Sequence, residues 1–298
     1  MKIPGIHHIT AIASDPQRNL DFYTQQLGLR LGKLTVNFDD PGTYHFYFGD
    51  EHGTPGSILT FFPWPGAPRG RSGTGQATVI SFTVPSLTAW AGKLPGERIT
   101  RRFDSDVLAF TDPDGMALEL VATGGEGRQG SEGSAISRFH SVTLSEGGYE
   151  ATARLLTETF GYELKASEDN RFRYVSSAGG FVDLLCQPDA RRGGMGAGTI
   201  HHVAFRAESD EIQKQWQAEL ARLNYNVTPI LDRQYFHSIY FREPGGVLFE
   251  IATDPPGFTV DETEASLGTA LKIPPALEPM RAEIEAKLPK LKLPVYVR

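Results

Sequence analysis

Two pairs of adjacent histidines and one glutamate carry the clearest chemical signal in this sequence. The pairs are His7-His8 near the start and His201-His202 in the last third, and each lies in an apolar run that predicts a strand. Since side chains alternate across a strand, only one histidine of each pair should face a given side. Glu250 lies in a later predicted strand of the segment that holds His201-His202. We expect His8, His202 and Glu250 to lie together.

Two imidazoles and one carboxylate form a well-known set of metal ligands. The same set occurs in non-haem Fe(II) oxygenases, where it leaves coordination positions open for a substrate and for O₂. Zn(II) and Mn(II) accept the same donor atoms, so the residue types alone leave the identity of the metal open.

A second glutamate occupies a matching place earlier in the chain. Glu119 corresponds to Glu250 by its position in an internal repeat, and His140 lies in the strand that would face it. However, His140 aligns with His201, and Ser141 takes the place of the expected ligand. The sequence therefore favours a structural carboxylate at Glu119 over a second metal site.

The predicted elements around these residues repeat one order four times, namely strand, helix and three strands. In the first unit, strands are expected near residues 6–13, 30–37, 44–49 and 58–62. The helix expected over residues 16–27 places Leu20, Tyr23 and Leu27 on one buried face. Further helices are expected over residues 87–93, 149–159 and 210–223. Repeats of this kind predict one fold built from four similar modules.

Changes in composition divide the chain. We expect an N-terminal domain over residues 1–123, with modules near 4–64 and 76–123, and a glycine-rich linker over 124–137. A C-terminal domain should follow over residues 138–262, with modules near 138–188 and 199–254. The tail, residues 263–298, should pack on the surface, with a helix over 279–288 that has Met280, Ile284 and Leu288 on one face.

Composition argues against several classes of protein. The formal net charge is −7 and no large basic cluster occurs, so nucleic-acid binding is not expected. No run of ~18 apolar residues suggests a membrane span. The single cysteine, Cys186, allows no intrachain disulfide; a reducing, cytoplasmic setting and a buried, inert thiol are expected. The sequence has neither a serine-hydrolase elbow nor a phosphate-binding glycine loop.

The ordered set of these features resembles the vicinal oxygen chelate superfamily, which includes glyoxalases, bleomycin resistance proteins and extradiol dioxygenases. The resemblance covers about residues 4–262. It lies in the four βαβββ units, in the run Phe-Tyr-Thr-Gln-Gln-Leu-Gly-Leu at residues 22–29, and in two Asp/Glu-Pro-x-Gly turns at residues 112–115 and 243–246. It implies an α+β fold in which four βαβββ modules form two half-open β-barrel domains.

The two histidine pairs and the stretch 233–240 resemble, more narrowly, the hydroquinone 1,2-dioxygenase branch. That resemblance implies Fe(II) held by His8, His202 and Glu250, with Mn(II) or Zn(II) as alternatives. It also assigns five residues to further active-site positions: His7, Thr10, His201, Arg233 and Tyr240. The implied reaction opens a small aromatic ring with O₂ beside a hydroxylated carbon, with Arg233 favouring an anionic substrate and His7, His201 or Tyr240 moving protons. Assembly into a homo-oligomer is left open.

Three other functions are compatible with the same fold. A glyoxalase-type isomerase or thiol transferase would also bind a metal, but such relatives usually use more than one carboxylate, and Thr60 stands where the extra ligand is expected. A non-catalytic, drug-sequestering member usually lacks the three metal ligands. A metal-binding regulatory or structural protein would hold the metal without consuming O₂.

Overall fold

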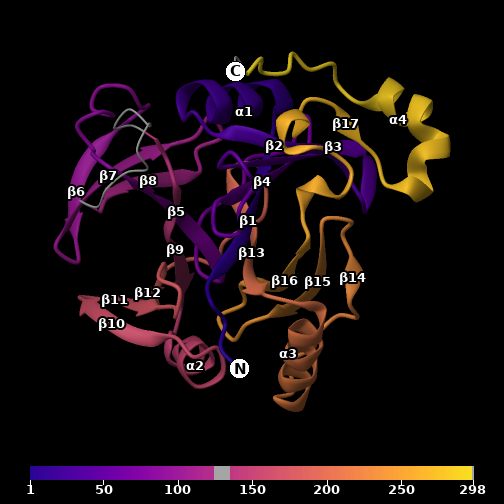
Figure 1. Ribbon diagram of the computed structural model, residues 1–298. Helices are drawn as coiled ribbons and strands as arrows, with labels where there is room; N and C mark the ends of the chain where they lie inside the picture. Colours follow the sequence, from indigo (N-terminus) through magenta and orange to yellow (C-terminus); the bar gives the residue numbers. More distant parts are fainter. Residues whose placement is uncertain (124–134, 297–298) are drawn as a thin grey trace.

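Each of the four units contributes its strands to one of two large curved sheets (Figure 1). The computed structural model describes residues 1–123 and 135–296. Unit one contains β1 (Ile6–Ala13), α1 (Pro16–Asp21), β2 (Arg30–Asn37), β3 (Asp40–Gly49) and β4 (Ile58–Pro63). Unit two contains β5 (Gln76–Val84), β6 (Arg98–Arg102), β7 (Ser105–Thr111) and β8 (Ala117–Ala122). Unit three contains β9 (Arg138–Glu146), α2 (Glu150–Arg154), β10 (Glu163–Glu168), β11 (Arg171–Val175) and β12 (Phe181–Cys186). Unit four contains β13 (Thr199–Ala207), α3 (Asp210–Arg222), β14 (Leu231–Asp232), β15 (Phe236–Arg242) and β16 (Leu248–Pro256).

The sheets combine units from opposite ends of the chain. One sheet has the order β14-β15-β16-β13-β1-β4-β3-β2-β17, where β17 is Leu271–Lys272 of the tail, and joins units four and one through the antiparallel pair β1–β13. The other has the order β10-β11-β12-β9-β5-β8-β7-β6 and joins units three and two through β5–β9. The predicted α+β fold of repeated modules in two half-open barrels is confirmed. The linear division into two domains stays a prediction, and residues 124–134 of the expected linker lie outside the described residues.

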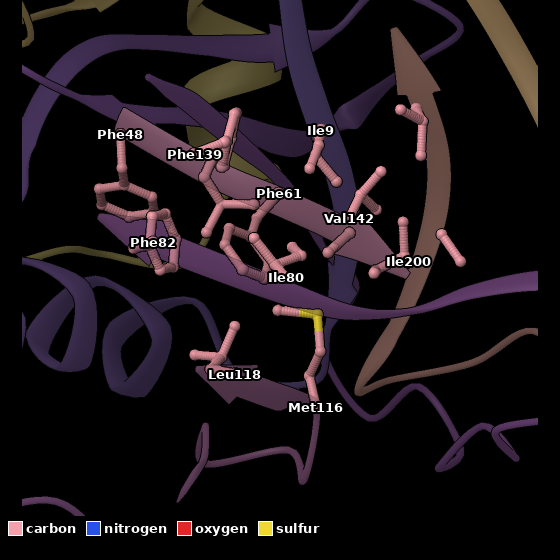
Figure 2. Close-up of a cluster of buried hydrophobic side chains, with 14 of the residues drawn as sticks. Ile9, Phe48, Phe61, Ile80, Phe82, Met116, Leu118, Phe139, Val142 and Ile200 are labelled. Carbon is pink, nitrogen blue, oxygen red and sulfur yellow. The ribbon is translucent and has the colours of Figure 1, made fainter. Parts of the chain in front are cut away.

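The sheets pack against each other through one apolar core, part of which is drawn in Figure 2. Ile9 and Phe61 come from the first sheet, and Ile80, Phe82 and Leu118 from the second; all five side chains are fully buried. Because neighbours on a strand point to opposite faces, a core-facing Ile9 turns His8 and Thr10 to the other face of β1. The core therefore fixes the direction in which the metal-ligand candidates point.

The local sequence explains where the helix α1 begins and where its π-helical continuation ends. Asp15 caps α1 by accepting a hydrogen bond from the Arg18 N–H, and Pro16 occupies the first turn. The helix continues as a π-helical turn over Phe22–Gln26, and Gly28 ends it at φ +68°. Leu20, Tyr23 and Leu27 are buried, so the face predicted for this helix is confirmed.

Two expectations about elements were wrong. Residues 87–93 form turns instead of a helix, because so short a segment gains too few hydrogen bonds to offset nucleation, and Gly92 takes φ +77°. Trp90 of this segment is buried nonetheless. The strand β10 was missed because its residues are mostly polar and exposed, as an edge strand allows, and show no alternation of apolar residues.

The tail is more than a surface appendage. Its strand β17 (Leu271–Lys272) pairs with β2 and extends the first sheet (Figure 1). The helix α4 (Arg281–Lys287) buries Ile284, and Leu288 just after it, whereas Met280 is 45% exposed. Near the end of the described chain, the Tyr296 hydroxyl accepts a hydrogen bond from the Leu31 N–H at 2.6 Å. No helix in the described ranges is long and apolar enough to cross a membrane.

Candidate metal centre

The candidate metal ligands come from three neighbouring strands of the first sheet. β1 and β13 run antiparallel, with Thr10 opposite His202, and β16 lies on the far side of β13, with Glu250 opposite Ala204. Because His8 belongs to unit one and the other two ligands to unit four, the candidate site exists only through the pairing of these units. The strand order thus explains why residues more than 190 positions apart in the sequence meet.

The three side chains converge on one point. The Nε2 atoms of His8 and His202 lie 3.4 Å apart, and the Glu250 Oε2 atom lies 3.4 Å from the first and 2.8 Å from the second. All three side chains are almost fully buried. Among the residues that the structure describes, they form the one group with the composition and closeness of a metal site.

The surroundings of Glu250 fit a bound cation. Its Oε1 atom accepts a hydrogen bond from the Ser238 hydroxyl at 2.5 Å. Its Oε2 atom is buried and faces the Nε2 atoms of the two imidazoles; when these nitrogens carry no hydrogen, as in metal ligands, Oε2 has no hydrogen-bond donor among the described residues. A buried acceptor in that state is costly unless it finds a positive partner. Burial opposes ionisation of Glu250, but the two histidines outweigh it and hold the pKa of the carboxyl well below its ordinary value.

Two β-bulges shape the histidine pairs. His7 is the extra residue where Ile6 and His8 oppose Phe205 and Ala204, and His201 is the extra residue opposite Thr10 and Ala11. Each bulge turns the first histidine of its pair toward the second, with Nδ1 atoms 2.9 Å apart for His7–His8 and 2.7 Å apart for His201–His202. Strict alternation within each pair was therefore a wrong expectation, because a bulge interrupts the pleat.

Metal binding at Nε2 would assign a tautomer to each ring. If Nε2 of His8 and His202 binds a metal, their Nδ1 atoms carry hydrogen and donate to Nδ1 of His7 and His201. Burial, and then the neighbouring histidine, lowers the pKa of both His7 and His201 to about 3, so both rings are neutral at physiological pH. A neutral ring that accepts at Nδ1 carries its hydrogen on Nε2. With these tautomers, His7 and His201 would orient the rings of the two candidate ligands.

A cavity of about 400 Å³ adjoins the candidate ligands. Its walls include the aromatic side chains of Phe38, Phe62, Trp64 and Phe236. His8 and His202 line it, and so do four of the five further predicted residues: Thr10, His201, Arg233 and Tyr240. Of the predicted set, His7 and Glu250 do not line this cavity. Its size and its walls suit one aromatic ring.

Arg233 and Tyr240 form one cluster at the cavity wall. The Arg233 guanidinium lies 5.7 Å from the centre of the Tyr240 ring and makes an ion pair with Asp39, which precedes β3, at 3.0 Å. Tyr240 lies directly opposite Glu250 on the neighbouring strand. Burial, and then the charge of Glu250, raises the pKa of Tyr240 well above its ordinary value, so its phenol keeps the proton.

Sequence reasoning missed a second polar group in this cavity. The Tyr47 hydroxyl lies 2.8 Å from His45 Nδ1, His45 Nε2 lies 2.9 Å from Thr60 Oγ1, and Thr60 Oγ1 lies 2.8 Å from Thr10 Oγ1. His45, Tyr47 and Thr10 line the cavity. His45 and Tyr47 are two residues apart on β3 and share a face, a pattern that could have drawn attention to them.

One direction of donation satisfies every member of this chain. Tyr47 is 1% exposed, and among the described residues its hydroxyl has His45 as its hydrogen-bond partner; if that hydroxyl donates to His45 Nδ1, the ring carries its hydrogen on Nε2. His45 Nε2–H then donates to Thr60, and the Thr60 hydroxyl donates to Thr10. The Thr10 hydroxyl is left as a donor for a molecule in the cavity. Such chains strengthen each member by polarisation.

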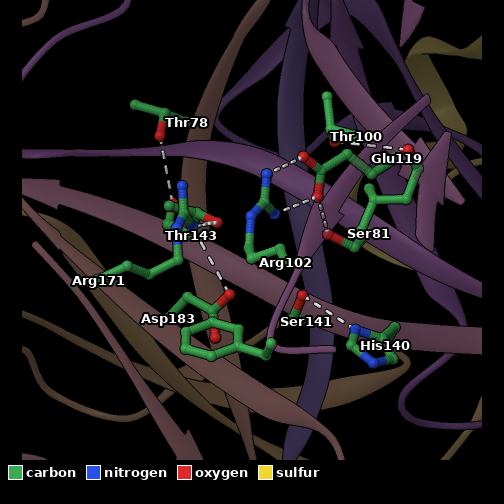
Figure 3. Close-up of polar contacts among 12 residues, drawn as sticks. Thr78, Ser81, Thr100, Arg102, Glu119, His140, Ser141, Thr143, Arg171 and Asp183 are labelled. Carbon is green, nitrogen blue, oxygen red and sulfur yellow. Dashed lines mark hydrogen bonds and ion pairs between the residues drawn. The ribbon is translucent and has the colours of Figure 1, made fainter. Parts of the chain in front are cut away.

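The position that corresponds to the metal centre in the second sheet holds ion pairs (Figure 3). Arg102 donates to both carboxylate oxygens of Glu119 at 2.8 Å, and the Ser81 hydroxyl adds a hydrogen bond at 2.7 Å. Asp183 is held likewise by Arg173. His140 Nδ1 contacts the Ser141 hydroxyl at 3.2 Å. Guanidinium groups thus take the place of a metal ion, in line with the expectation that Glu119 is structural.

Two further residues of chemical interest lie away from the centre. His237, on β15, is hydrogen-bonded to Asp210 at the start of α3, with a distance of 2.6 Å between its Nδ1 and the carboxylate. Cys186 is half-buried at the end of β12, more accessible than expected for a buried thiol.

The fold and the buried centre of two histidines and one glutamate define a class. The family model described as the Glyoxalase/Bleomycin resistance protein/Dioxygenase superfamily matches residues 5–120 and 138–251, and the chain belongs to that superfamily. The dioxygenase family and the three-residue site together imply a metal cofactor.

Individual relatives narrow this class. The chain is 48% identical to MhqO of Bacillus subtilis, which is named as a provisional ring-cleaving dioxygenase, over 100% of this chain and 98% of that protein. It is 32% identical, over 95% of each chain, to a protein of Sphingobium indicum named chlorohydroquinone/hydroquinone 1,2-dioxygenase. A crystal structure from Bacillus subtilis, described as a provisional dioxygenase, superposes with a TM-score of 0.93 at 46% identity and covers 98% of this chain and 99% of that chain.

Proposed function

We propose that this protein is an Fe(II)-dependent dioxygenase that opens the ring of a hydroquinone, substituted or unsubstituted, or of a related phenol. The observation that carries the proposal is the convergence of His8, His202 and Glu250 beside a cavity with aromatic walls. The names of the relatives support it, since one refers to ring cleavage and another to hydroquinone. The partners of the protein are then a small aromatic molecule and O₂.

The proposed reaction balances without a further oxidant or reductant. The bond between a hydroxylated ring carbon and its unsubstituted neighbour breaks, and both atoms of O₂ enter the product. The hydroxylated carbon becomes a carboxylic acid and its neighbour becomes an aldehyde. Fe(II) held by His8, His202 and Glu250 would supply the redox chemistry that joins ring and O₂.

The side chains of the cavity bind and orient the substrate. The cationic Arg233 favours the phenolate form of a bound hydroquinone over the neutral form. The Thr10 hydroxyl, directed by the chain from Tyr47, donates a hydrogen bond to a substrate oxygen, and Tyr240 is a second donor because its phenol stays protonated. His201 is neutral and carries hydrogen on Nε2, so it serves as a donor and as the orienting partner of His202.

The surroundings of Thr60 support a dioxygenase over an isomerase of the same fold. Glyoxalase-type members would place an extra carboxylate ligand at this position. Here the Thr60 hydroxyl is engaged by Thr10 and His45 at 2.8 and 2.9 Å and contributes no charge. A single carboxylate with two imidazoles matches the ligand set of ring-cleaving Fe(II) enzymes.

The test is O₂ uptake by protein reconstituted anaerobically with Fe(II) and then given methylhydroquinone. We expect one O₂ consumed per substrate and a ring-opened product that carries a carboxylate. Protein that binds iron fully and consumes no O₂ with methyl- or chlorohydroquinone would refute the proposal. Reconstitution with Mn(II) or Zn(II) in parallel identifies the metal that supports turnover.

We also propose that the protein works in a reducing, cytoplasmic setting. The chain has one cysteine, which is typical of proteins that do not rely on disulfides. Assembly into a homo-oligomer stays a prediction, and light scattering after size-exclusion chromatography tests it.

A further inference from the structure

A second cavity adjoins the same two histidines. It has a volume of about 380 Å³, and His201, His202 and Leu248 line it as they line the first cavity. Its other residues come from the start of β5, from the loop before β13 and from the turn between β15 and β16. The candidate metal centre therefore has two neighbouring cavities, with the half-buried His201 side chain between them.

The two cavities differ in chemistry. The first is walled by aromatic rings, and its arginine, Arg233, is already paired with Asp39. The second is flanked by Arg192 and Arg242, and within the described part of the chain neither of them forms an ion pair. Two guanidinium groups without a carboxylate partner attract an anion.

Gly246 allows both arginines to approach the same turn. The Arg242 guanidinium donates to the Gly246 carbonyl at 2.9 Å. The Arg192 guanidinium lies over the Cα of the same residue, since a Cβ added to Gly246 would stand 2.8 Å from Arg192 Nη2. Gly246 also takes φ +102°, which side chains rarely adopt. The turn between β15 and β16 thus brings both charges to one edge of the cavity.

We propose that this second cavity binds the carboxylate of the ring-opened product, which leaves the metal centre by that side. The inference rests on the proposed function, because ring opening converts a hydroxylated carbon into a carboxylic acid that ionises at neutral pH. A ring without a carboxylate fits the aromatic cavity, whereas the open-chain anion fits the arginine-flanked one. The product is thereby drawn away from the cavity that the next substrate must enter.

The test uses trans,trans-muconate as a stable open-chain dicarboxylate. Its binding to the iron-loaded protein is measured by calorimetry without O₂, so no turnover is involved. We expect Arg192→Gln and Arg242→Gln each to weaken binding about tenfold, as loss of one charge-assisted contact implies. Arg192→Lys should retain part of the affinity. Arg191→Gln, which removes a neighbouring exposed arginine outside the cavity, should leave it unchanged.

A second binding measurement distinguishes the two cavities, and it also distinguishes failure of this inference from failure of the proposed function. 4-Methylphenol, a ring without a carboxylate, should bind the double variant Arg192→Gln/Arg242→Gln as tightly as the unmodified protein. Unchanged muconate affinity in the double variant, or an equal loss for 4-methylphenol, would overturn the inference. If the unmodified protein consumes no O₂ but binds muconate through both arginines, the ring-cleavage proposal fails while the carboxylate site stands.

Discussion

At the scale of single residues, the centre depends on imidazoles that differ in role although they are adjacent in sequence. His8 and His202 direct Nε2 toward Glu250, while His7 and His201 support them through Nδ1 contacts of 2.9 and 2.7 Å. Removing a ligand and removing its supporting neighbour should therefore have different effects.

We predict that His202→Ala loses metal, because two of three ligands cannot hold the ion in competition with water. Metal content after reconstitution, measured by mass spectrometry, should fall to background. His201→Ala should retain metal with about 10–100-fold lower affinity, as the loss of an orienting partner implies. His237→Ala, outside the site, is the control. Full iron occupancy in His202→Ala would contradict the assignment.

The hydrogen-bonded chain that ends at Thr10 gives a second prediction at this scale. Tyr47→Phe removes the first donor and with it the fixed direction of the chain, at a cost of about 1 kcal/mol. We expect kcat/KM for methylhydroquinone to fall about fivefold. In a Thr10→Val background, Tyr47→Phe should not lower kcat/KM further. Additive losses in the double variant would show that Tyr47 acts independently of Thr10.

The sequence predicted which three candidate ligands the structure brings together better than it predicted the contacts around them. His8, His202 and Glu250 could be proposed because residue type and repeat position coincide in them. The bulges at His7 and His201 could not be predicted, since the alternation of apolar and polar residues does not reveal a bulge. The contacts of His45 and Thr60 were missed because they join β3 and β4 with β1, and such pairings depend on register.

At the scale of elements, equivalent strands of the two sheets have acquired opposite polar chemistry. β16 places Glu250 against imidazoles, and β8 places Glu119 against Arg102. The elements themselves were largely predictable, because strongly apolar strands dominate them and α3 is an amphipathic helix of 13 residues. The turns at residues 87–93 and the strand β10 were not predictable, since tertiary packing decides the conformation of short or polar segments.

We predict that Arg102→Met destabilises the protein by about 3–5 kcal/mol, because the buried Glu119 loses both hydrogen bonds from its guanidinium partner. The free energy of unfolding from urea titration measures this. Arg102→Met/Glu119→Leu should recover most of the loss, since a buried pair can often be replaced by apolar side chains. Arg101→Met, an exposed neighbour, is the control. A double variant no more stable than Arg102→Met would contradict this account.

The same pair predicts a dependence of stability on pH. Burial opposes ionisation of Glu119, but Arg102 and Ser81 outweigh it, so the pKa of Glu119 lies below its ordinary value of 4.5. A lowered pKa in the folded state stabilises the fold above the ordinary pKa and loses that contribution as pH falls below it. Glu119→Gln should therefore show a weaker loss of stability between pH 5 and pH 3, by urea titration, than the unmodified protein. An equal loss would contradict the role of this carboxylate.

At the scale of the whole molecule, a buried lysine joins the first unit to the chain that follows the fourth. Lys33, on β2, is fully buried and binds the Phe258 carbonyl at 2.8 Å, Asp261 at 2.7 Å and Glu262. The aromatic rings of Tyr235 and Phe258 lie beside its ammonium group. This contact reinforces the sheet that carries the metal centre.

We predict that Lys33→Met lowers the free energy of unfolding by about 3–5 kcal/mol, because Glu262 loses its buried partner. Urea titration measures the change, and Lys93→Met, an exposed lysine, is the control. An effect no larger than that of the control would mean that water replaces the ammonium group at this site.

The pairing of β1 with β13 also has a consequence for synthesis of the protein on the ribosome. At roughly 5–20 residues per second, about 10–50 s pass between the addition of His8 and that of Glu250. During that interval β1 has one edge without its partner strand, and its two histidines are accessible to any metal ion in the cell. Pairing with β4 covers only the opposite edge of β1, so the edge that receives β13 stays open until the last unit emerges.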